Sequence, residues 1–431
     1  MPVSAARAAA FDVLLQVEQE DAYASELLHS SRYLKLSNTD HGLATELVMG
    51  VLRWQSLLDE RVEAHSSRSL DKLDRQVLIA LRLAAYQLLF LDRVPAHAAV
   101  DESVELVKRA RKRSAVPFVN AVLRKLAVQP REKLPPWFAH PLWLVERWTS
   151  SCGCDAAQLI CSYDQRAPET AIRLSDPTAE AELEQRGIRL APGHLLTRAR
   201  RVVHGDVSNT QAFREGRIAI QDEASQLVAL LVGRGVNVLD CCAAPGGKTR
   251  VLAERNPEAN IVAVELHPHR ARLLRKLVSA DKVRVIAADV RTLPLSARFD
   301  RVLVDAPCSG TGTLARNPEI KWRLKPDDLL NLQGRQIAIL QAAMKHVVHG
   351  GSLVYSTCSL EREENEEVVE KALAADQSLH LLECRPELVR LRDEGELAWR
   401  DPDSLTCGPY LRTIPGVHPC DGFFAALLGR A

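Results

Sequence analysis

One stretch, residues 236–249, constrains the fold more than any other part of the chain. Its first five residues, VNVLD, have the apolar character of a buried strand that ends at Asp240. Pro245, Gly246 and Gly247 then require a tight turn, and residues 248–254 resume helical spacing. A strand, a glycine turn and a helix N-terminus together form a place that can hold a polar small molecule.

The chain beyond residue 216 alternates strands with helices, which is the pattern of a mostly parallel sheet. The expected strands are residues 236–241, 261–265, 283–287, 301–305, 352–356, 379–382 and 423–427. We therefore predict an α/β, Rossmann-like domain over residues 216–431, with a mostly parallel seven-stranded sheet.

Two regions precede this domain. Residues 1–130 carry apolar side chains at helical spacing and predict an all-helical bundle. Residues 127–136 are rich in proline and predict a linker. Residues 137–215 predict a small α/β region, with strands at 170–174 and 195–203 and a helix between Asp176 and Gly187.

Basic residues gather in both of these regions, although the formal net charge of the 431-residue chain is only +1. The run KRARKR at residues 108–113, with Arg124 and Lys125 close behind, indicates contact with a phosphate backbone at least as strongly as it indicates a solvated surface. Arginines of the small α/β region suggest RNA contact as well; they are Arg173, Arg189, Arg198, Arg200 and Arg201. By contrast, residues 361–370 are strongly acidic.

The ten cysteines are irregularly spaced, and no signal-peptide pattern is present at the start of the chain. Reduced thiols and a cytoplasmic location are therefore expected. The longest apolar run, residues 77–91, is interrupted by Arg82 and Gln87 and is too short to span a bilayer. Cys152 and Cys154 lack a second close pair of ligands, so we expect no metal site.

Acidic residues follow four successive predicted strands, where the carboxyl ends of a parallel sheet bind ligands. They are Asp240, Glu265, Asp289 and Asp305. One such acid is commonly a helix cap, but four favour a ligand with ribose hydroxyls and an amino group, which is a nucleoside. A triphosphate-binding loop would need glycine at the position of Cys242, which argues against a nucleoside triphosphatase.

Two cysteines lie at the ends of adjacent predicted strands. Cys308 stands in DAPCSGTG at residues 305–312, and Cys358 stands in STCS at residues 356–359. A lone cysteine is usually a small buried apolar residue, as we expect for Cys161 and Cys384. A thiolate in a strand-end loop near Lys248 can instead be a nucleophile, so both Cys308 and Cys358 are candidates.

These motifs resemble those of the RNA cytosine-5 methyltransferases that use S-adenosylmethionine. The matching stretches are DCCAAPGGKT at residues 240–249, DAPCSGTG at 305–312, NPEIKW at 317–322, STCS at 356–359 and DGFF at 421–424. The helical N-terminal region resembles the NusB-like RNA-binding bundle of the bacterial Sun/Fmu (RsmB) branch, which methylates 16S rRNA. The resemblance covers essentially the whole chain, and Glu265 departs from it because aspartate is more usual there.

The resemblance implies a role for each matching residue. S-adenosylmethionine would be bound by Cys242, Ala243, Ala244, Pro245, Gly246, Gly247, Lys248, Glu265, Asp289 and Asp305. Cys358 would attack C6 of cytosine, and Cys308 would assist release of the enzyme. Asp305 and Lys248 would also stabilise the activated ring. The target would be one cytosine of 16S rRNA, of the 967 type, and the enzyme would act as a monomer without a metal.

Three alternatives stay open. Cys308 could be the attacking thiol, as in DNA cytosine methyltransferases that have a Pro-Cys motif. The substrate could be a tRNA, because the NusB-like region rather than the catalytic residues points to ribosomal RNA. The chain could also be an RNA-binding or antitermination-like factor with an inactive methyltransferase domain, although such a factor has no use for two thiols in strand-end loops.

Overall fold

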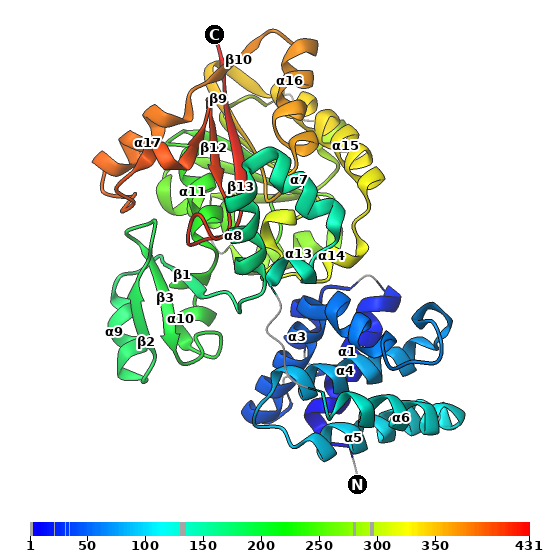
Figure 1. Cartoon of the computed structure of the whole chain (residues 1–431). Coiled ribbons are helices and arrows are strands. Elements are labelled where there is room, and N and C mark those ends of the chain that lie inside the picture. The colour runs from blue at the N-terminus through cyan, green and yellow to red at the C-terminus, as the bar shows by residue number, and fades with distance from the viewer. Residues whose placement is uncertain are drawn as a thin grey trace. The chain divides into compact units, whose positions relative to one another are not determined.

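Each of two units is assembled from two separate ranges of the chain. The computed structural model describes residues 3–20, 22–30, 32–33, 35–129, 135–278, 282–293 and 297–431. The helical unit consists of Met1–Ala167 with Leu314–Arg323, and the sheet unit consists of Pro168–Thr313 with Leu324–Ala431 (Figure 1). Residues 130–134, within the predicted linker, lie outside the described residues.

The helical unit is built from amphipathic helices. They are α1 (Ala5–Glu20), α2 (Ala24–Leu28), α3 (Asn38–Glu63), α4 (Arg75–Phe90), α5 (Ala96–Arg109), α6 (Val116–Leu126), α7 (Leu142–Cys152), α8 (Cys154–Asp164) and α14 (Ile320–Arg323). Side chains spaced by three or four residues along α3 are buried in one common core, for example Leu47, Val51, Leu58 and Val62. The all-helical fold predicted for residues 1–130 is confirmed over the described part of that range.

The ten residues Leu314–Arg323 complete the helical unit from far along the chain. Lys321 is almost fully buried, and its Nζ donates to the backbone carbonyls of Arg53 and Ala139, at 2.9 Å each. Trp322 donates its indole N–H to the carbonyl of Leu52 at 2.7 Å. The NPEIKW motif therefore anchors this segment among helices that precede it by more than 150 residues.

The sheet unit begins with a small antiparallel sheet in the order β2-β3-β1-β4. Its strands are β1 (Thr170–Leu174), β2 (Arg189–Pro192), β3 (Ala199–His204) and β4 (Ile218–Ile220), with helices α9 (Thr178–Gln185) and α10 (Gln211–Arg214). The predicted strand at 170–174 is confirmed, and the one expected at 195–203 begins only at Ala199. Strands β2 and β4 were not predicted, because three or four residues are too few to show an alternating pattern.

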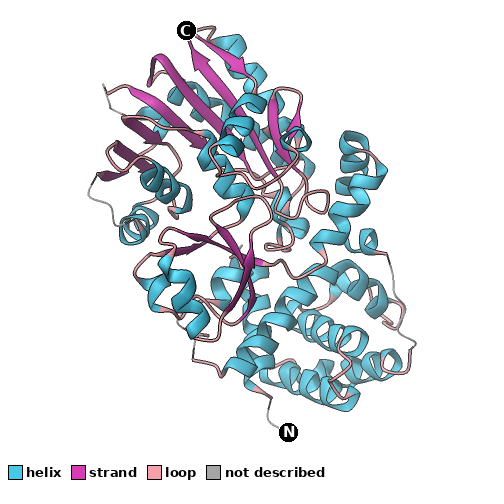
Figure 2. Ribbon diagram, turned by 90° about the vertical axis from the view of Figure 1, so that its left-hand side faces the viewer, coloured by secondary structure: helices cyan, strands magenta, loops and turns pink. Residues whose placement is uncertain are grey.

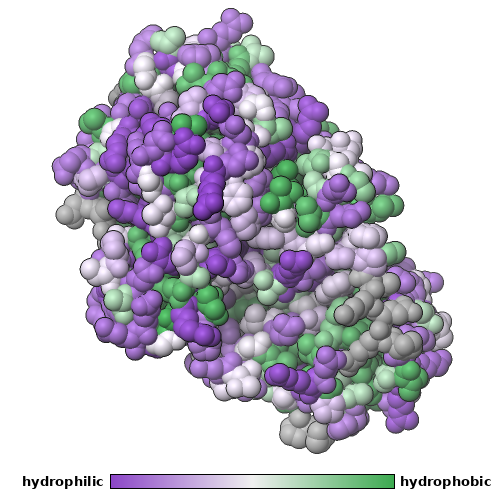
Figure 3. All heavy atoms as spheres, turned by 60° about the vertical axis from the view of Figure 1, so that its left-hand side comes forward, coloured by the Kyte–Doolittle hydropathy of each residue, from purple (hydrophilic) through white to green (hydrophobic). Residues whose placement is uncertain are grey.

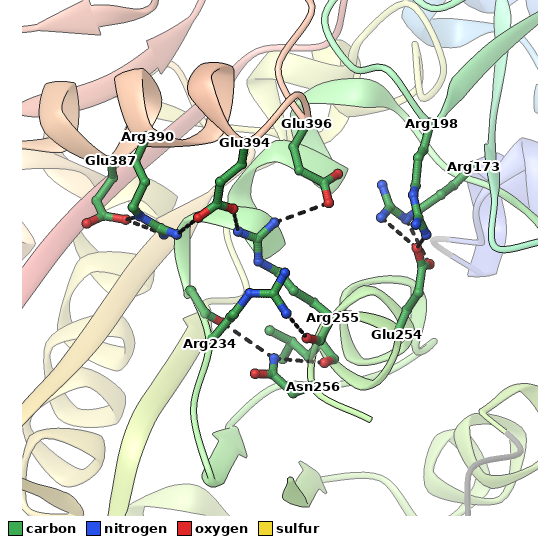
Figure 4. Close-up of polar contacts among 12 residues, drawn as sticks. Arg173, Arg198, Arg234, Glu254, Arg255, Asn256, Glu387, Arg390, Glu394 and Glu396 are labelled. Carbon is green, nitrogen blue, oxygen red and sulfur yellow. Dashed lines mark hydrogen bonds and ion pairs between the residues drawn. The ribbon is translucent and has the colours of Figure 1, made fainter. Parts of the chain in front are cut away.

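Most arginines of this small sheet are engaged by carboxylates rather than free to bind RNA. Arg173 and Arg198 both contact Glu254, and Figure 4 shows the two guanidinium groups converging on that side chain. The other pairs are Arg200 with Glu180 and Arg201 with Glu169. The predicted basic RNA contact is therefore weakened here, because four of the five arginines have an acidic neighbour that the linear sequence did not reveal.

The main sheet has nine strands among the described residues. Its order is β11-β12-β13-β9-β8-β5-β6-β7, and β10 also pairs with β13. The strands are β5 (Asn237–Asp240), β6 (Asn260–Glu265), β7 (Val283–Ala287), β8 (Phe299–Asp305), β9 (Val347–Thr357), β10 (Leu379–Leu382), β11 (Thr406–Cys407), β12 (Tyr410–Thr413) and β13 (Phe423–Arg430). Strands β5 to β9 are mutually parallel, and β13 pairs antiparallel with β9.

The predicted class of this domain is confirmed, but the predicted number of seven strands is wrong. All seven expected strands are present, and β11 and β12 are added at the edge. These two strands have two and four residues and flank the turn at Gly408 and Pro409, so they carry no strand-length apolar pattern.

Helices cover both faces of the main sheet (Figure 2). They are α11 (Glu223–Leu231), α12 (Gly247–Arg255), α13 (Pro268–Leu277), α15 (Pro326–Met344), α16 (Glu366–Ala375) and α17 (Cys384–Asp393). Successive side chains of β8 lie on opposite faces of the sheet. Leu303 packs in the hydrophobic core that includes α11 and α12, whereas Val302 and Val304 pack in the core that includes α15 and α16. The parallel strands therefore end together at one edge of a buried sheet.

None of the described helices is long and apolar enough to cross a membrane. Figure 3 shows hydrophilic side chains over most of the face that it presents, with the hydrophobic ones in scattered groups.

Candidate active site

The loop between β5 and α12 is held close to its neighbours. The backbone N–H of Ala243 donates to the carbonyl of Val264 at 2.9 Å, which ties the loop to the adjacent strand. Gly246 has φ +118°, and a Cβ there would lie 2.7 Å from Leu274 and 2.9 Å from Val278. Glycine is required at this turn for both reasons, and the turn leads directly into the N-terminus of α12.

Three of the four predicted acidic residues surround this loop. Burial raises the pKa of the Cys242 thiol, and the charges of Asp240, Asp305 and Glu265 raise it further, so all three carboxylates lie near that side chain. Glu265 is buried at the end of β6 and accepts a hydrogen bond from the backbone N–H of His267 at 2.9 Å.

Asp289 has a different environment. It follows the edge strand β7 and caps the short 3-10 helix Val290–Thr292, accepting from the backbone N–H of Arg291 at 2.9 Å. The Arg291 guanidinium also contacts both Asp289 carboxylate oxygens, and this hydrogen bonding lowers the pKa of Asp289. Asp289 is thus already paired within its own loop.

Lys248 and Asp305 form an ion pair between the start of α12 and the end of β8. The Lys248 Nζ lies 2.7 Å from Asp305 Oδ2, and Ser356 donates to Asp305 Oδ1 at 2.9 Å. The same ammonium group lies 4.8 Å from the ring centroid of Phe423. Nearby, Asp240 is buried and accepts from the Thr249 hydroxyl at 2.7 Å, and burial raises the pKa of Asp240 to about 7.

The two candidate nucleophiles are in direct contact. The sulfurs of Cys308 and Cys358 are 3.2 Å apart, because β8 and β9 are adjacent parallel strands in which Asp305 pairs with Ser356. The hydrogen bond to Cys358 and burial both raise the pKa of Cys308, so Cys308 is held as a thiol that can donate toward its partner. The structure thus brings together the two cysteines that the sequence placed at neighbouring strand ends.

Backbone contacts join the two cysteine loops. The N–H of Gly312 donates to the carbonyl of Cys358 at 2.9 Å, and the N–H of Leu360 donates to the Thr311 hydroxyl at 2.9 Å. The N–H of Gly422 donates to the carbonyl of Gly312 at 2.7 Å, and a Cβ on Gly312 would lie 2.2 Å from the Gly422 oxygen. The DAPCSGTG, STCS and DGFF motifs therefore meet in one place.

A buried carboxylate beneath these loops was missed by the sequence analysis. Glu364 is fully buried and accepts hydrogen bonds from Ser309, Ser359 and Gln336. Burial raises the pKa of its carboxyl group. Its position inside the acidic stretch 361–370 hid it, because neighbouring glutamates in such a run are ordinarily solvated.

Known families match both parts of the chain. A family model described as 16S rRNA methyltransferase RsmB/F matches residues 228–429, and the NusB family model matches residues 4–128. The ribosomal RNA small subunit methyltransferase B of Vibrio cholerae is 32% identical, over 98% of this chain and 97% of its own length. The protein of the same name from Cronobacter sakazakii is 30% identical, over 98% of both chains.

Solved structures share the fold. The crystal structure of PH0851 has a TM-score of 0.81 at 24% identity, covering 98% of this chain and 97% of that chain. A methyltransferase homologue from Pyrococcus horikoshii has a TM-score of 0.55 at 25% identity, covering 68% of this chain and 96% of that chain.

Proposed function

Since the chain belongs to the RsmB/F family of 16S rRNA methyltransferases, we propose that it methylates C5 of a cytosine in 16S rRNA with S-adenosylmethionine. By family resemblance the target is the cytosine of the 967 type. The observation that carries the proposal is the contact between Cys308 and Cys358, 3.2 Å apart at the strand ends that also hold the Lys248–Asp305 ion pair. A binding factor would need neither thiol.

The loop after β5 fits the methyl donor. The tight turn at Gly246 brings backbone N–H groups and the N-terminus of α12 to the sheet edge, where polar ligand groups bind. Glu265 and Asp305 would accept from ribose hydroxyls and the donor's amino group, with the loop residues 242–247 and Lys248 beside them. Asp289 would accept from the adenine amino group only if it also gave up part of its contact with Arg291. S-adenosylmethionine supplies the methyl group as an electrophile.

The two thiols would then have different tasks. The Cys358 sulfur adds to C6 of the cytosine, and the displaced electron pair makes C5 nucleophilic enough to be methylated. After C5 loses its proton, the bond between Cys358 and C6 breaks and the ring double bond is restored. The hydrogen bond to Cys358 and burial raise the pKa of the Cys308 thiol, so Cys308 can donate a hydrogen bond to the Cys358 sulfur as that sulfur leaves C6.

Lys248 and Asp305 would bind the N3 edge of the ring. The cytosine needs this help because C5 is a poor nucleophile until the thiolate has added, and the base must be unstacked to expose its face. In the helical unit, Arg111, Arg113, Arg124 and Lys125 are exposed, and they support contact with the phosphate backbone of the RNA.

The test is methyl transfer followed by mapping. Purified protein is incubated with methyl-tritiated S-adenosylmethionine and either 16S rRNA or tRNA from a strain that lacks the gene, with Cys358→Ala protein as the control. We expect label in 16S rRNA only, and bisulfite sequencing should place it at one cytosine. Label in tRNA alone, or none in any RNA, contradicts the proposal.

A further inference from the structure

We infer that Glu364 is a positioning residue, which holds the two catalytic cysteines at their working separation by tying together the residues that follow them. The consequence for catalysis rests on the proposed function, but the effect on sulfur spacing does not. Glu364 ends a short 3-10 helix, Arg362–Glu364, and Asn365 separates it from α16. Its side chain forms hydrogen bonds with the loops after β8 and β9.

Each carboxylate oxygen of Glu364 has its own set of donors. Oε1 accepts from the backbone N–H of Ser309 at 2.8 Å and from the side-chain amide of Gln336 at 2.9 Å. Oε2 accepts from the hydroxyls of Ser309 and Ser359, the latter at 2.5 Å. Ser309 directly follows Cys308, and Ser359 directly follows Cys358, so one side chain fixes both loops.

The Glu364 carboxylate accepts a hydrogen bond from every donor that faces it. It offers about four acceptor sites, and all four are used here by donors that are themselves buried. The Ser309 and Ser359 hydroxyls also lie 3.1 Å from each other, so loss of Glu364 would leave that pair without its common anchor. Tyr355 adds a separate contact, donating its hydroxyl to the backbone carbonyl of Glu364, which fixes the backbone from which the carboxylate extends.

The two oxygens differ in a way that makes glutamine a matched substitution. The Oε1 side faces an amide N–H and an amide NH₂, which can only donate, so the glutamine oxygen must lie there. The Oε2 side faces two hydroxyls, which can turn and accept from the glutamine NH₂. Glu364→Gln should therefore keep the tie between the loops without the charge, whereas Glu364→Ala removes it.

Sulfur spacing can be measured by oxidation, independently of methyl transfer. The full-length protein is treated with diamide, which takes up the two thiol hydrogens as a disulfide forms, and the Cys308–Cys358 peptide pair is quantified by mass spectrometry over time. We expect cross-linking at least tenfold slower in Glu364→Ala and within threefold of the unmodified protein in Glu364→Gln. Glu223→Ala is the control, because Glu223 is also buried but accepts from backbone N–H groups of residues 194–196.

Methyl transfer by the same variants gives the second measurement. We expect kcat to fall at least 100-fold in Glu364→Ala and less than tenfold in Glu364→Gln, with KM for S-adenosylmethionine within threefold in both. If Glu364→Ala does not fold, Ser359→Ala replaces it, since that change removes one of the two ties, and a three- to tenfold slower cross-link is expected.

The inference would be overturned if folded Glu364→Ala protein formed the disulfide at the unmodified rate. If Glu364→Ala does not fold, an unchanged rate in Ser359→Ala would overturn it instead. Slowing of disulfide formation in Glu223→Ala as large as that in Glu364→Ala would overturn it as well. A protein that cross-links as described but transfers no methyl group would leave the positioning role intact and refute the proposed function instead.

Discussion

Asp305 has its two carboxylate oxygens committed to different partners, Lys248 on one side and Ser356 on the other. A charge-assisted contact of 2.7 Å between Lys248 and Asp305 holds the lysine ammonium group at the carboxyl ends of the parallel strands, where it can donate to a bound base. Cys308, by contrast, is held as a neutral thiol against Cys358. The site thus places a cation, an anion and two thiols within neighbouring loops.

Asp240 gives a prediction about stability and pH. Burial raises its folded-state pKa from 3.8 to about 7, so its contribution to folding is fully present below pH 3.8 and is lost as the pH rises through 7. Asp240→Asn cannot ionise and should be free of this loss. Between pH 5 and pH 8 we expect the unfolding free energy of the unmodified protein to fall by about 2–3 kcal/mol relative to Asp240→Asn. Urea denaturation of both proteins at pH 5 and pH 8 measures the two unfolding free energies. An equal change in unfolding free energy in both proteins between the two pH values would contradict a buried Asp240 that ionises in this range.

At the residue scale, the sequence singled out the candidate cysteines and Lys248 but not the side chains that hold their loops in place. The cysteines and Lys248 could be predicted because glycine-rich and proline-rich strand ends mark them. Glu364 could not, because its burial depends on Gln336 and Ser309, which come from elements that are distant in sequence. The pairing of Asp289 with Arg291 was equally hidden, since adjacent opposite charges in a loop are commonly both solvated.

The loop from β5 to α12 is the element on which donor binding depends. Gly246→Ala should distort it, because alanine is disfavoured at φ +118° and its Cβ would overlap Leu274 and Val278. We expect affinity for S-adenosylmethionine to fall at least tenfold, about 1.4 kcal/mol, by isothermal titration calorimetry. Gly395→Ala is the matched control, with φ +75° and no atom within 4 Å of the new Cβ, and equal loss of affinity in that variant would refute the argument.

Strand prediction succeeded for those strands of the main sheet whose residues show a run of apolar side chains in the sequence. Strands β5, β6, β8, β9 and β13 carry runs of buried apolar residues because helices cover both faces of the sheet. Strands β2, β4, β11 and β12 have two to four residues and owe their conformation to neighbouring strands. Their pairing is a tertiary effect that no local propensity records.

For the whole molecule, the sequence did not reveal that Leu314–Arg323 belongs to the helical unit. The predicted small α/β region at 137–215 is also wrong at its start, because residues 137–167 belong to the helical unit and only the residues from Pro168 onward belong to the sheet unit. The sequence analysis identified NPEIKW as a motif but not its structural role, which is to hold residues 314–323 in the helical unit through the buried Lys321. Burial lowers the pKa of the Lys321 ammonium group. Hydrogen bonds to two buried carbonyls hold this side chain, and nothing local to residues 314–323 identifies those acceptors.

Lys321→Met should loosen the helical unit. The carbonyls of Arg53 and Ala139 would lose their shared donor, at a cost of roughly 1–3 kcal/mol for each buried group left unpaired. Hydrogen exchange should accelerate in α3 and around residue 139. The exposed Lys325 provides the control, and similar exchange in Lys321→Met and Lys325→Met would show that the buried contacts contribute nothing.

The central claim is that Cys358 attacks the base and Cys308 releases it. It is tested most directly by incubating Cys308→Ala and Cys358→Ala proteins with 16S rRNA and S-adenosylmethionine, and resolving the products on a denaturing gel. We predict that Cys308→Ala accumulates a covalent protein–RNA adduct, whereas Cys358→Ala forms none and transfers no methyl group. An adduct that accumulates in Cys358→Ala and is absent from Cys308→Ala would contradict this assignment.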